Sequence, residues 1–311
     1  MVPTIPYKRE KDPADEEGYQ GATVLDAQTG AYYGPITALD FASLYPSIMC
    51  AHNLCYSSMV MDPKYDNLPD VQYEQYGPYK FAQGTQSLLP AILTELKEFR
   101  KKAKKDMAAA EGTPMEAVYN GKQLAYKISM NSVYGFTGAV GGGMLPLVAI
   151  ASTVTLRGRQ MIEETKDYVE ANFPGAKVRY GDTDSVMVEF DVGGRKGQEA
   201  IDYSWVQGEQ AAEACTKLFK APNDLELEKV YCPYFLYSKK RYAAKMYEKN
   251  KVGEIAFKKI DVKGLQVVRR DSCPFVRETL KGLLGQILES SDPRPVIETA
   301  REAARNLMQG N

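Results

Sequence analysis

The spacing of apolar residues along the first half of the chain predicts a short buried strand followed by two long helices. Residues 36–41 (ITALDF) form a short apolar run that is typical of a buried strand. Apolar residues at helical spacing, with lysines on the opposite side, predict a helix over 87–110 and a second over 115–134. Because EGTP interrupts the pattern between them, we expect an antiparallel helical hairpin.

The next part of the chain predicts a third long helix and a β-hairpin. The helix is expected over 147–172, after the glycine-rich segment 138–143. Two short apolar runs, 177–180 and 185–190, flank the turn Gly181-Asp182-Thr183-Asp184. A glycine-bearing turn between such runs is typical of a β-hairpin.

The remaining segments complete an α+β fold with a helical insertion between strands. Strand-like segments occur within 225–262, and amphipathic helices are expected over 275–288 and 295–308. Residues 1–35 and 59–84 lack periodicity and are expected to be irregular, although Pro46, just after the first strand, favours a turn or the first turn of a helix.

The net charge of the whole chain does not indicate nucleic-acid binding, but the charge of two short segments does. The 311 residues carry a net charge of −1, whereas nucleic-acid-binding domains are usually basic. Residues 97–105 nevertheless hold six basic residues and one acid, and residues 239–270 hold eleven basic residues and three acids. Acids elsewhere, notably in 10–17, balance them. Local basic patches of this kind attract polyanions.

Cysteine usage and hydropathy indicate an intracellular chain without a membrane span. The five cysteines form no C-x-x-C pair and are expected to be free thiols in a reducing compartment. Cys50, His52 and Cys55 lack the further ligands of a zinc site and are interpreted as buried residues. The N-terminus has no apolar signal region, and the apolar stretch 144–154 is too short to cross a bilayer.

Three aspartates are candidates for metal binding. Asp182 and Asp184 are two residues apart on the hairpin turn, and Asp40 ends the first strand. If those strands are neighbours in one sheet, the three carboxylates converge, and Mg²⁺ prefers carboxylate and phosphate oxygens. Two ions about 3.5–4 Å apart would suit phosphoryl transfer. Two alternatives remain open: solvated turn aspartates, or the D-x-D motif of a metal-dependent glycosyltransferase.

The helical hairpin carries candidate phosphate-binding residues. Arg100 and Lys104 share one face of the first helix, and Lys127, Asn131 and Tyr134 share one face of the second. Facing one another, they would form a cationic site for a triphosphate. For Lys101, Lys102 and Lys105 a solvated surface is the better interpretation. Lys127 lies among apolar neighbours (Leu124, Ala125, Ile128 and Val133), where an unpaired ammonium would be costly.

Four segments together resemble the motifs of family B DNA polymerases, in the family's order. DFASLYPSI (40–48), KISMNSVYG (127–135) and YGDTDSV (180–186) resemble the three polymerase motifs, and KKRY (239–242) resembles the primer-duplex motif. The flanking sequence is most similar to the delta-like branch of eukaryotes and large algal DNA viruses. The resemblance implies a DNA-directed DNA polymerase that adds dNTPs to a primer 3′-hydroxyl with two Mg²⁺ ions during DNA replication.

The same resemblance implies a right-hand polymerase core. An antiparallel-sheet palm would begin within 1–84 and continue over 139–272. Helical-hairpin fingers would occupy 85–138, and a truncated helical thumb would start at 273–311.

Carried over residue by residue, the resemblance implies three groups of site residues. Asp40 and Asp184 would hold the metal ions, with Asp182 in support. Residues that would bind the incoming nucleotide are Ser43, Leu44, Tyr45, Arg100, Lys104, Lys127, Asn131 and Tyr134. Residues that would bind primer-template DNA are Lys239, Lys240, Arg241, Tyr242 and Lys263. Tyr45 would stack under the deoxyribose and exclude a 2′-hydroxyl.

The sequence also departs from the family pattern. No proofreading exonuclease sequence is present, no cysteine-rich tail follows, and the Y-x-G-G linker appears as Tyr19-Gln20-Gly21-Ala22. We therefore expect part of a larger polypeptide that acts in the nucleus or at a viral replication site. A sliding clamp or accessory subunits would bind through regions outside this chain. A primer-template-binding module without catalysis remains an alternative.

Overall fold

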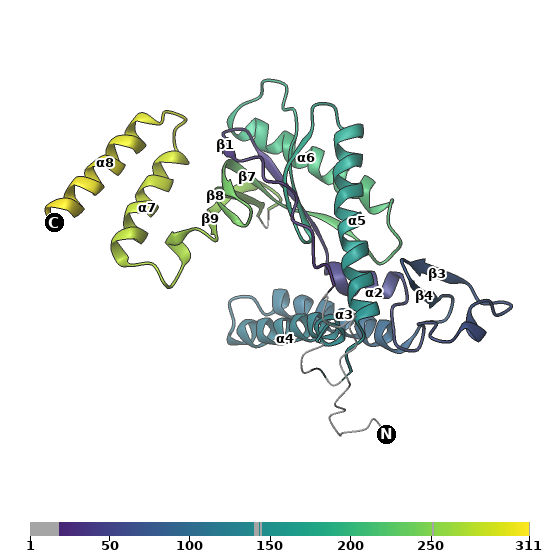
Figure 1. Cartoon of the computed structure of the whole chain (residues 1–311). Helices are drawn as coiled ribbons and strands as arrows, with labels where there is room; N and C mark the ends of the chain where they lie inside the picture. The colour runs from purple at the N-terminus through teal and green to yellow at the C-terminus, as the bar shows by residue number, and fades with distance from the viewer. Residues whose placement is uncertain (1–18, 140–142, 144, 251, 311) are drawn as a thin grey trace. The chain divides into compact units, whose positions relative to one another are not determined.

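The computed structural model describes residues 19–139, 143, 145–250 and 252–310 (Figure 1). The acidic segment 10–17, the N-terminal residues considered for a signal peptide and part of the glycine-rich segment 138–143 lie outside these residues. The chain forms two compact units. Of the described residues, one unit contains Thr23–Phe41, Met161–Phe219 and those from Asp224 on; the other contains residues 19–22, those within Ala42–Gln160, and Lys220–Asn223.

A seven-stranded sheet dominates the first of these units. Its order is β5-β6-β2-β7-β8-β9, with β1 paired to β7, and every pairing is antiparallel. The strands are β1 (Gly30–Tyr32), β2 (Ile36–Phe41), β5 (Lys177–Asp182), β6 (Ser185–Glu189), β7 (Leu225–Ser238), β8 (Arg241–Lys249) and β9 (Ile255–Lys263). The predicted strand at 36–41 and the predicted hairpin around residue 183 are therefore confirmed, and the fold is a mixed α/β fold with an antiparallel sheet.

Helix α6 (Gly197–Thr216), which was not predicted from the sequence, packs on this sheet against β2 and β7 (Figure 1). The helix approaches β2 closely at Gly208, where a Cβ atom would lie 2.6 Å from the Thr37 Cγ2 atom. The Thr37 and Ser204 hydroxyls form a hydrogen bond of 2.8 Å within this buried contact. Glycine and serine are thus what allow the helix to lie against the strand.

Four tyrosines form much of the core of the sheet. Tyr180, Tyr231, Tyr234 and Tyr242 are all buried in one cluster with apolar residues from β2 and β8. The rings of Tyr231 and Tyr234 stack with centroids 5.5 Å apart, and Tyr231 donates a hydrogen bond of 2.8 Å to the buried carboxylate of Asp261. These hydroxyls bring polar chemistry into an otherwise apolar core.

Two C-terminal helices complete the unit. The predicted helices are confirmed as α7 (Pro274–Ile287) and α8 (Arg294–Gln309), after a short 3₁₀ helix, η2 (Gln266–Val268). Leu284 and Leu288 pack near Ala243 of β8. The Tyr33 hydroxyl contacts the carbonyl oxygens of Ile287 and Ser290 at 3.0 and 2.8 Å.

The other unit is built around the predicted helical hairpin. Helices α3 (Leu88–Ala109) and α4 (Pro114–Thr137) lie side by side, and both contact α2 (Leu44–Ala51) (Figure 1). Pro46 does lie in the first turn of α2. The long helix α5 (Val148–Asn172) is shared between the units and changes unit after Gln160. Residues 145–160, which were expected to belong with the sheet, therefore belong to the helical unit.

Residues 59–84 correct the expectation of an irregular segment. They contain a 3₁₀ helix, η1 (Pro63–Tyr65), and a two-stranded sheet of β3 (Tyr73–Tyr76) and β4 (Tyr79–Ala82). Gly77 occupies the turn with φ of 56°, a left-handed conformation that glycine adopts without strain. No helix within the described residues is long and apolar enough to cross a membrane.

Candidate functional site

The strand register brings the predicted catalytic aspartates to one end of the sheet. Asp40 on β2 and Asp182 on β5 are both register partners of Ser185 on β6. Asp184 follows in the β5–β6 turn, where Thr183 adopts a left-handed φ of 60°. The Phe41 amide donates a hydrogen bond of 2.8 Å to the Asp184 carbonyl oxygen. Strand β2 is therefore a direct neighbour of β6, the second strand of the predicted hairpin, while β5, which carries Asp182, lies one strand further.

The electrostatics of Asp40 favour a bound cation. Burial, and then the carboxylate of Asp184, raise the pKa of Asp40 to about 7; Glu228 and Glu226 act in the same direction, and Lys229 opposes them without reversing the shift. A partly buried carboxyl with acidic neighbours is costly to ionise without positive charge nearby. A divalent cation would supply that charge, so the donor set fits Mg²⁺.

The described residues contain no group of three or more His, Cys, Asp or Glu side chains that is arranged to hold a metal ion. Mg²⁺ in phosphoryl-transfer sites is commonly held by one or two carboxylates together with substrate phosphates and water. Asp40 and Asp184 match that type of site.

Asp182 has a different environment from its two neighbours. Its carboxylate accepts hydrogen bonds from the Lys240 ammonium at 2.8 Å, the Thr183 hydroxyl at 3.0 Å and the Tyr180 hydroxyl at 3.2 Å. These donors already satisfy both carboxylate oxygens, which agrees with the supporting role expected for this residue.

The predicted DNA-binding residues gather at one end of strands β7, β8 and β9. Lys239, Lys240 and Arg241 are exposed at the β7–β8 turn, and Lys263 is exposed opposite Tyr242 on the neighbouring strand. Lys239 forms an ion pair of 2.8 Å with Asp26, and Lys263 lies 3.6 Å from Asp261.

Tyr242 requires a correction. Its side chain is only 8% exposed and packs in the tyrosine core. Because alternate side chains of a strand point to opposite faces, Tyr242 points inward where Arg241 points outward. The side chain of Tyr242 therefore supports the turn from within and is not placed to contact DNA.

In the helical unit, four of the residues predicted to bind the nucleotide contact one another in two pairs. The Arg100 guanidinium donates to the Ser43 hydroxyl at 3.5 Å, and the rings of Tyr45 and Tyr134 lie 4.5 Å apart. Ser43 precedes α2 with a left-handed φ of 52°, an uncommon conformation for serine that often marks functional sites. Leu44, next in the chain, is buried, so only its backbone could contact a ligand.

The remaining members of the nucleotide-binding group face solvent. Lys104, Lys127 and Asn131 are exposed on α3 and α4. For Lys127 this corrects the expectation of an apolar environment: Leu124 is 44% exposed and Ile128 is 66% exposed. The apolar neighbours of Lys127 are themselves at the surface, so no desolvation cost arises there.

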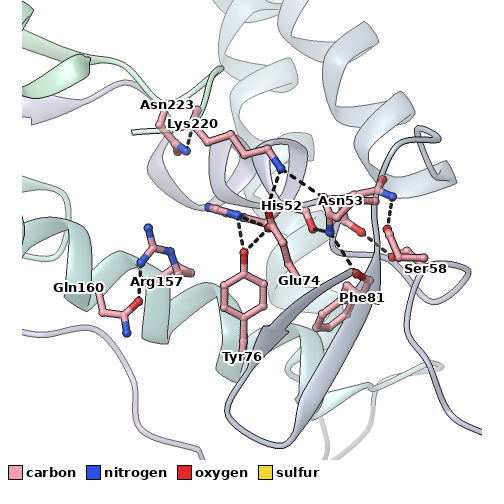
Figure 2. A network of polar contacts seen from close by, with 12 residues as sticks. His52, Asn53, Ser58, Glu74, Tyr76, Phe81, Arg157, Gln160, Lys220 and Asn223 are labelled. Atoms are coloured by element: carbon pink, nitrogen blue, oxygen red, sulfur yellow. Dashed lines mark hydrogen bonds and ion pairs between the residues drawn. The ribbon is translucent and has the colours of Figure 1, made fainter. Parts of the chain in front are cut away.

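A polar network at the C-terminal end of α2, where His52 follows the helix, was not anticipated from the sequence. Figure 2 shows Glu74 and Tyr76 of the β3–β4 hairpin directed toward His52, with Lys220 reaching Glu74. Burial alone would raise the pKa of Glu74, but hydrogen bonds from Tyr76, His52 and Lys220 outweigh it and lower the pKa to about 2. Nothing in the local sequence pattern of 59–84 indicates these contacts.

Comparison with known proteins decides the family. The sequence profile described as DNA polymerase family B matches residues 2–310. The chain belongs to DNA polymerase family B. A DNA polymerase of Paramecium bursaria Chlorella virus NY2A is 48% identical over 296 residues, covering 90% of this chain and 32% of the viral protein. The DNA polymerase delta catalytic subunit of Caenorhabditis elegans is 43% identical over 315 residues, covering 96% and 28%.

The corresponding subunit of Arabidopsis thaliana is 44% identical over 311 residues, covering 96% of this chain and 27% of its own length. The chain thus spans about a third or less of the curated relatives that it matches. Family membership removes the glycosyltransferase alternative for the D-x-D turn.

Proposed function

We propose that this chain carries the nucleotidyl-transfer centre of a DNA-directed DNA polymerase that acts in DNA replication. The observation that carries the proposal is the meeting of Asp40 and Asp184 at one end of the sheet, with the pKa of Asp40 raised by burial and by Asp184. Two Mg²⁺ ions held there would activate a primer 3′-hydroxyl and stabilise the leaving pyrophosphate. Asp40 and Asp184 would be the protein ligands.

The helical unit would bind the incoming dNTP. Ser43 follows Asp40 by three positions in the chain, so the nucleotide-binding and metal-binding residues share one segment. Burial lowers the pKa of Arg100, and a phosphate would stabilise its charge in return. Stacked against Tyr134, Tyr45 would be the side chain that a 2′-hydroxyl meets.

The β7–β8 turn and Lys263 would hold primer-template DNA. Lys240 and Arg241 are exposed and close in register to Lys263. Hydrogen-bond acceptors in the minor groove are similar for all base pairs, so cationic side chains there would bind any correctly paired primer end. In this proposal the sheet is the palm, α3 and α4 are the fingers, and α7 and α8 begin the thumb. Sliding-clamp or accessory-subunit contacts would belong to the parent protein.

Primer extension tests the proposal. The purified chain is given a primer-template, Mg²⁺ and four dNTPs, and compared with Asp184→Asn. Asp167→Asn, an exposed carboxylate on α5, serves as a matched charge control. We expect extension by the wild type and the control, and a rate at least about 100-fold lower for Asp184→Asn.

Extension by Asp184→Asn at the wild-type rate would refute the assignment of Asp184. Salt-sensitive duplex binding without extension at any enzyme concentration would instead select the non-catalytic binding module.

A further inference from the structure

Two groups hold the carboxylate of Asp182. One is the ammonium of Lys240, and the other is the hydroxyl of Tyr180, which itself contacts the Lys240 backbone. One oxygen accepts a hydrogen bond from the Lys240 ammonium at 2.8 Å, and the other accepts from the Tyr180 hydroxyl at 3.2 Å. The same Tyr180 hydroxyl accepts a hydrogen bond of 2.7 Å from the Lys240 backbone amide. Tyr180 therefore links the catalytic turn to the β7–β8 turn.

The direction of these hydrogen bonds is fixed by chemistry. A backbone N–H can only donate, so the Tyr180 oxygen is the acceptor from Lys240. An ionised carboxylate can only accept, so the single Tyr180 proton points to Asp182. The Tyr180 hydroxyl thus accepts from the Lys240 backbone and donates to the Asp182 carboxylate. Rotation of the hydroxyl proton cannot exchange these two roles.

Tyr180 and Lys240 are both closely packed. The Tyr180 side chain is 1% exposed and its ring is packed in the tyrosine core. Lys240 has a left-handed φ of 62°, and Gly264 lies so close to it that a Cβ atom there would be 2.1 Å from the Lys240 carbonyl oxygen. The backbone of Lys240 is therefore confined at its carbonyl group by Gly264 and at its amide by the Tyr180 hydroxyl.

Tyr234 shows that packing in this cluster does not itself require a hydroxyl contact. Its ring is buried in the same core, yet its hydroxyl has no hydrogen-bond partner among the described residues. The hydroxyl of Tyr180 is distinguished by its place between a predicted DNA-binding residue and a predicted catalytic one.

We infer that the Tyr180 hydroxyl is a positioning group that sets the Asp182 carboxylate relative to the β7–β8 turn. The hydroxyl and the Lys240 ammonium thereby hold the Asp182 carboxylate at a fixed place relative to the turn that primer-template DNA would contact. The inference rests on the proposed polymerase function, and it assigns Tyr180 no contact with substrate.

The first test compares Tyr180→Phe with Tyr234→Phe, each of which removes one buried hydroxyl from the same cluster. For Tyr180→Phe we expect kcat for single-nucleotide incorporation to fall about tenfold, as for other groups that orient a functional side chain. The KM for dNTP should stay within about twofold, because the predicted nucleotide-binding side chains are untouched. Tyr234→Phe should change neither constant and should not lower Tm, since an unpartnered hydroxyl is lost.

A double-mutant cycle then separates positioning from simple packing. In an Asp182→Asn background, Tyr180→Phe should cause no further loss of kcat, because its effect passes through that carboxylate. The same cycle measured on Tm should also be non-additive, and this readout survives if Asp182→Asn is too slow to assay. Additive losses in the cycle, or a kcat for Tyr180→Phe equal to that of the wild type, would overturn the inference.

The proposed polymerase function and the positioning role of Tyr180 can be refuted independently. Absence of extension by the wild type would refute the proposed function, while the Tm cycle would still report whether Tyr180 and Asp182 are coupled. Normal wild-type extension with no coupling would refute the positioning role alone.

Discussion

The backbone amide of Phe41 donates a hydrogen bond to the carbonyl oxygen of Asp184 at 2.8 Å. This bond ties the end of β2, where Asp40 lies, to the turn that carries Asp184. The backbone therefore brings the two carboxylates together without help from an ion. Such preorganisation on paired strands is what a metal-dependent site requires, but it makes the metal-free fold electrostatically unfavourable at this point.

Asp40→Asn should therefore stabilise the metal-free chain at high pH. The pKa of Asp40 is raised from 3.8 to about 7, so the folded state binds its proton more tightly than the unfolded state. The cost of ionising Asp40 accumulates as pH rises from about 4 to 7 and is complete at pH 8. We expect Asp40→Asn to raise the free energy of unfolding by about 1–2 kcal/mol at pH 8 in EDTA, after allowing for solvent screening.

Thermal or urea unfolding at pH 8 and pH 4 measures this effect. The stabilisation should disappear at pH 4, where wild-type Asp40 is protonated in the folded state. Destabilisation by Asp40→Asn at pH 8 would show that the carboxylate has a cationic partner already.

Tyr45→Ala should reduce discrimination against ribonucleotides. The Tyr45 ring packs against Tyr134, and it lies beside Gly158, where an added Cβ atom would be 3.4 Å from the Tyr45 Cε1 atom. Removing the ring would open space for a 2′-hydroxyl. We expect the dNTP-to-rNTP ratio of kcat/KM to fall by about 100-fold, a steric effect of roughly 3 kcal/mol. An unchanged ratio would mean that Tyr45 only packs.

Gly264→Ala should destabilise the β7–β8 turn. Its Cβ atom would lie 2.1 Å from the Lys240 carbonyl oxygen, and φ at this position is 64°. Gly253→Ala is a matched control, since φ there is 89° but, apart from Gly253 and its two chain neighbours, no atom of the described residues lies within 4 Å of its Cβ position. We expect about 1 kcal/mol of lost stability for the control and at least about 2–3 kcal/mol for Gly264→Ala.

Weaker binding of primer-template DNA should accompany only Gly264→Ala, because only that substitution displaces Lys240. Denaturant unfolding and fluorescence anisotropy measure the two quantities. Equal losses for both variants would show that the close contact at Lys240 has no consequence.

The Glu74 network should make the helical unit sensitive to acid. Hydrogen bonds lower the folded-state pKa of Glu74 to about 2, against an ordinary value of 4.5. A lowered carboxylate pKa contributes stability that is present above pH 4.5 and is lost as pH falls toward 2. Glu74→Gln should therefore lower Tm at pH 7, and the difference from wild type should shrink between pH 4.5 and 2.

Glu98→Gln, an exposed carboxylate of α3, is the control for that measurement. A Tm difference for Glu74→Gln that is independent of pH would exclude an ionic role for Glu74 in the network.

An element of this fold was predictable from the sequence when its buried residues were large and apolar. Strand β2 has Ile36, Thr37, Ala38 and Leu39 at 1% exposure or less, because it lies inside the sheet between β6 and β7. Burial on both faces produces the continuous apolar run that predicted it. Helix α6 was missed because its buried face consists largely of small residues such as Ala200, Ser204 and Gly208, which give weak hydropathy contrast despite their helical spacing.

Features of the candidate site were predictable where the residues involved are close together in the sequence. The turn that carries Asp182 and Asp184 is local in sequence, so its chemistry was accessible. The Tyr180–Lys240 contact joins residues 60 positions apart and depends on the β7–β8 turn geometry, which no local pattern encodes. The prediction of an apolar environment for Lys127 was wrong for a related reason. Helical spacing places apolar residues beside Lys127 but does not show whether another element covers that face of the helix.

Binding of Mn²⁺, followed by electron paramagnetic resonance, tests the central claim most directly. The wild type, Asp40→Asn, Asp184→Asn and the control Asp167→Asn are titrated with a dideoxy-terminated primer-template and the next dNTP present. If Asp40 and Asp184 hold the ions together, each of their substitutions weakens binding by about 10-fold or more while the control binds as the wild type does. Wild-type Mn²⁺ affinity in both Asp40→Asn and Asp184→Asn would contradict the account.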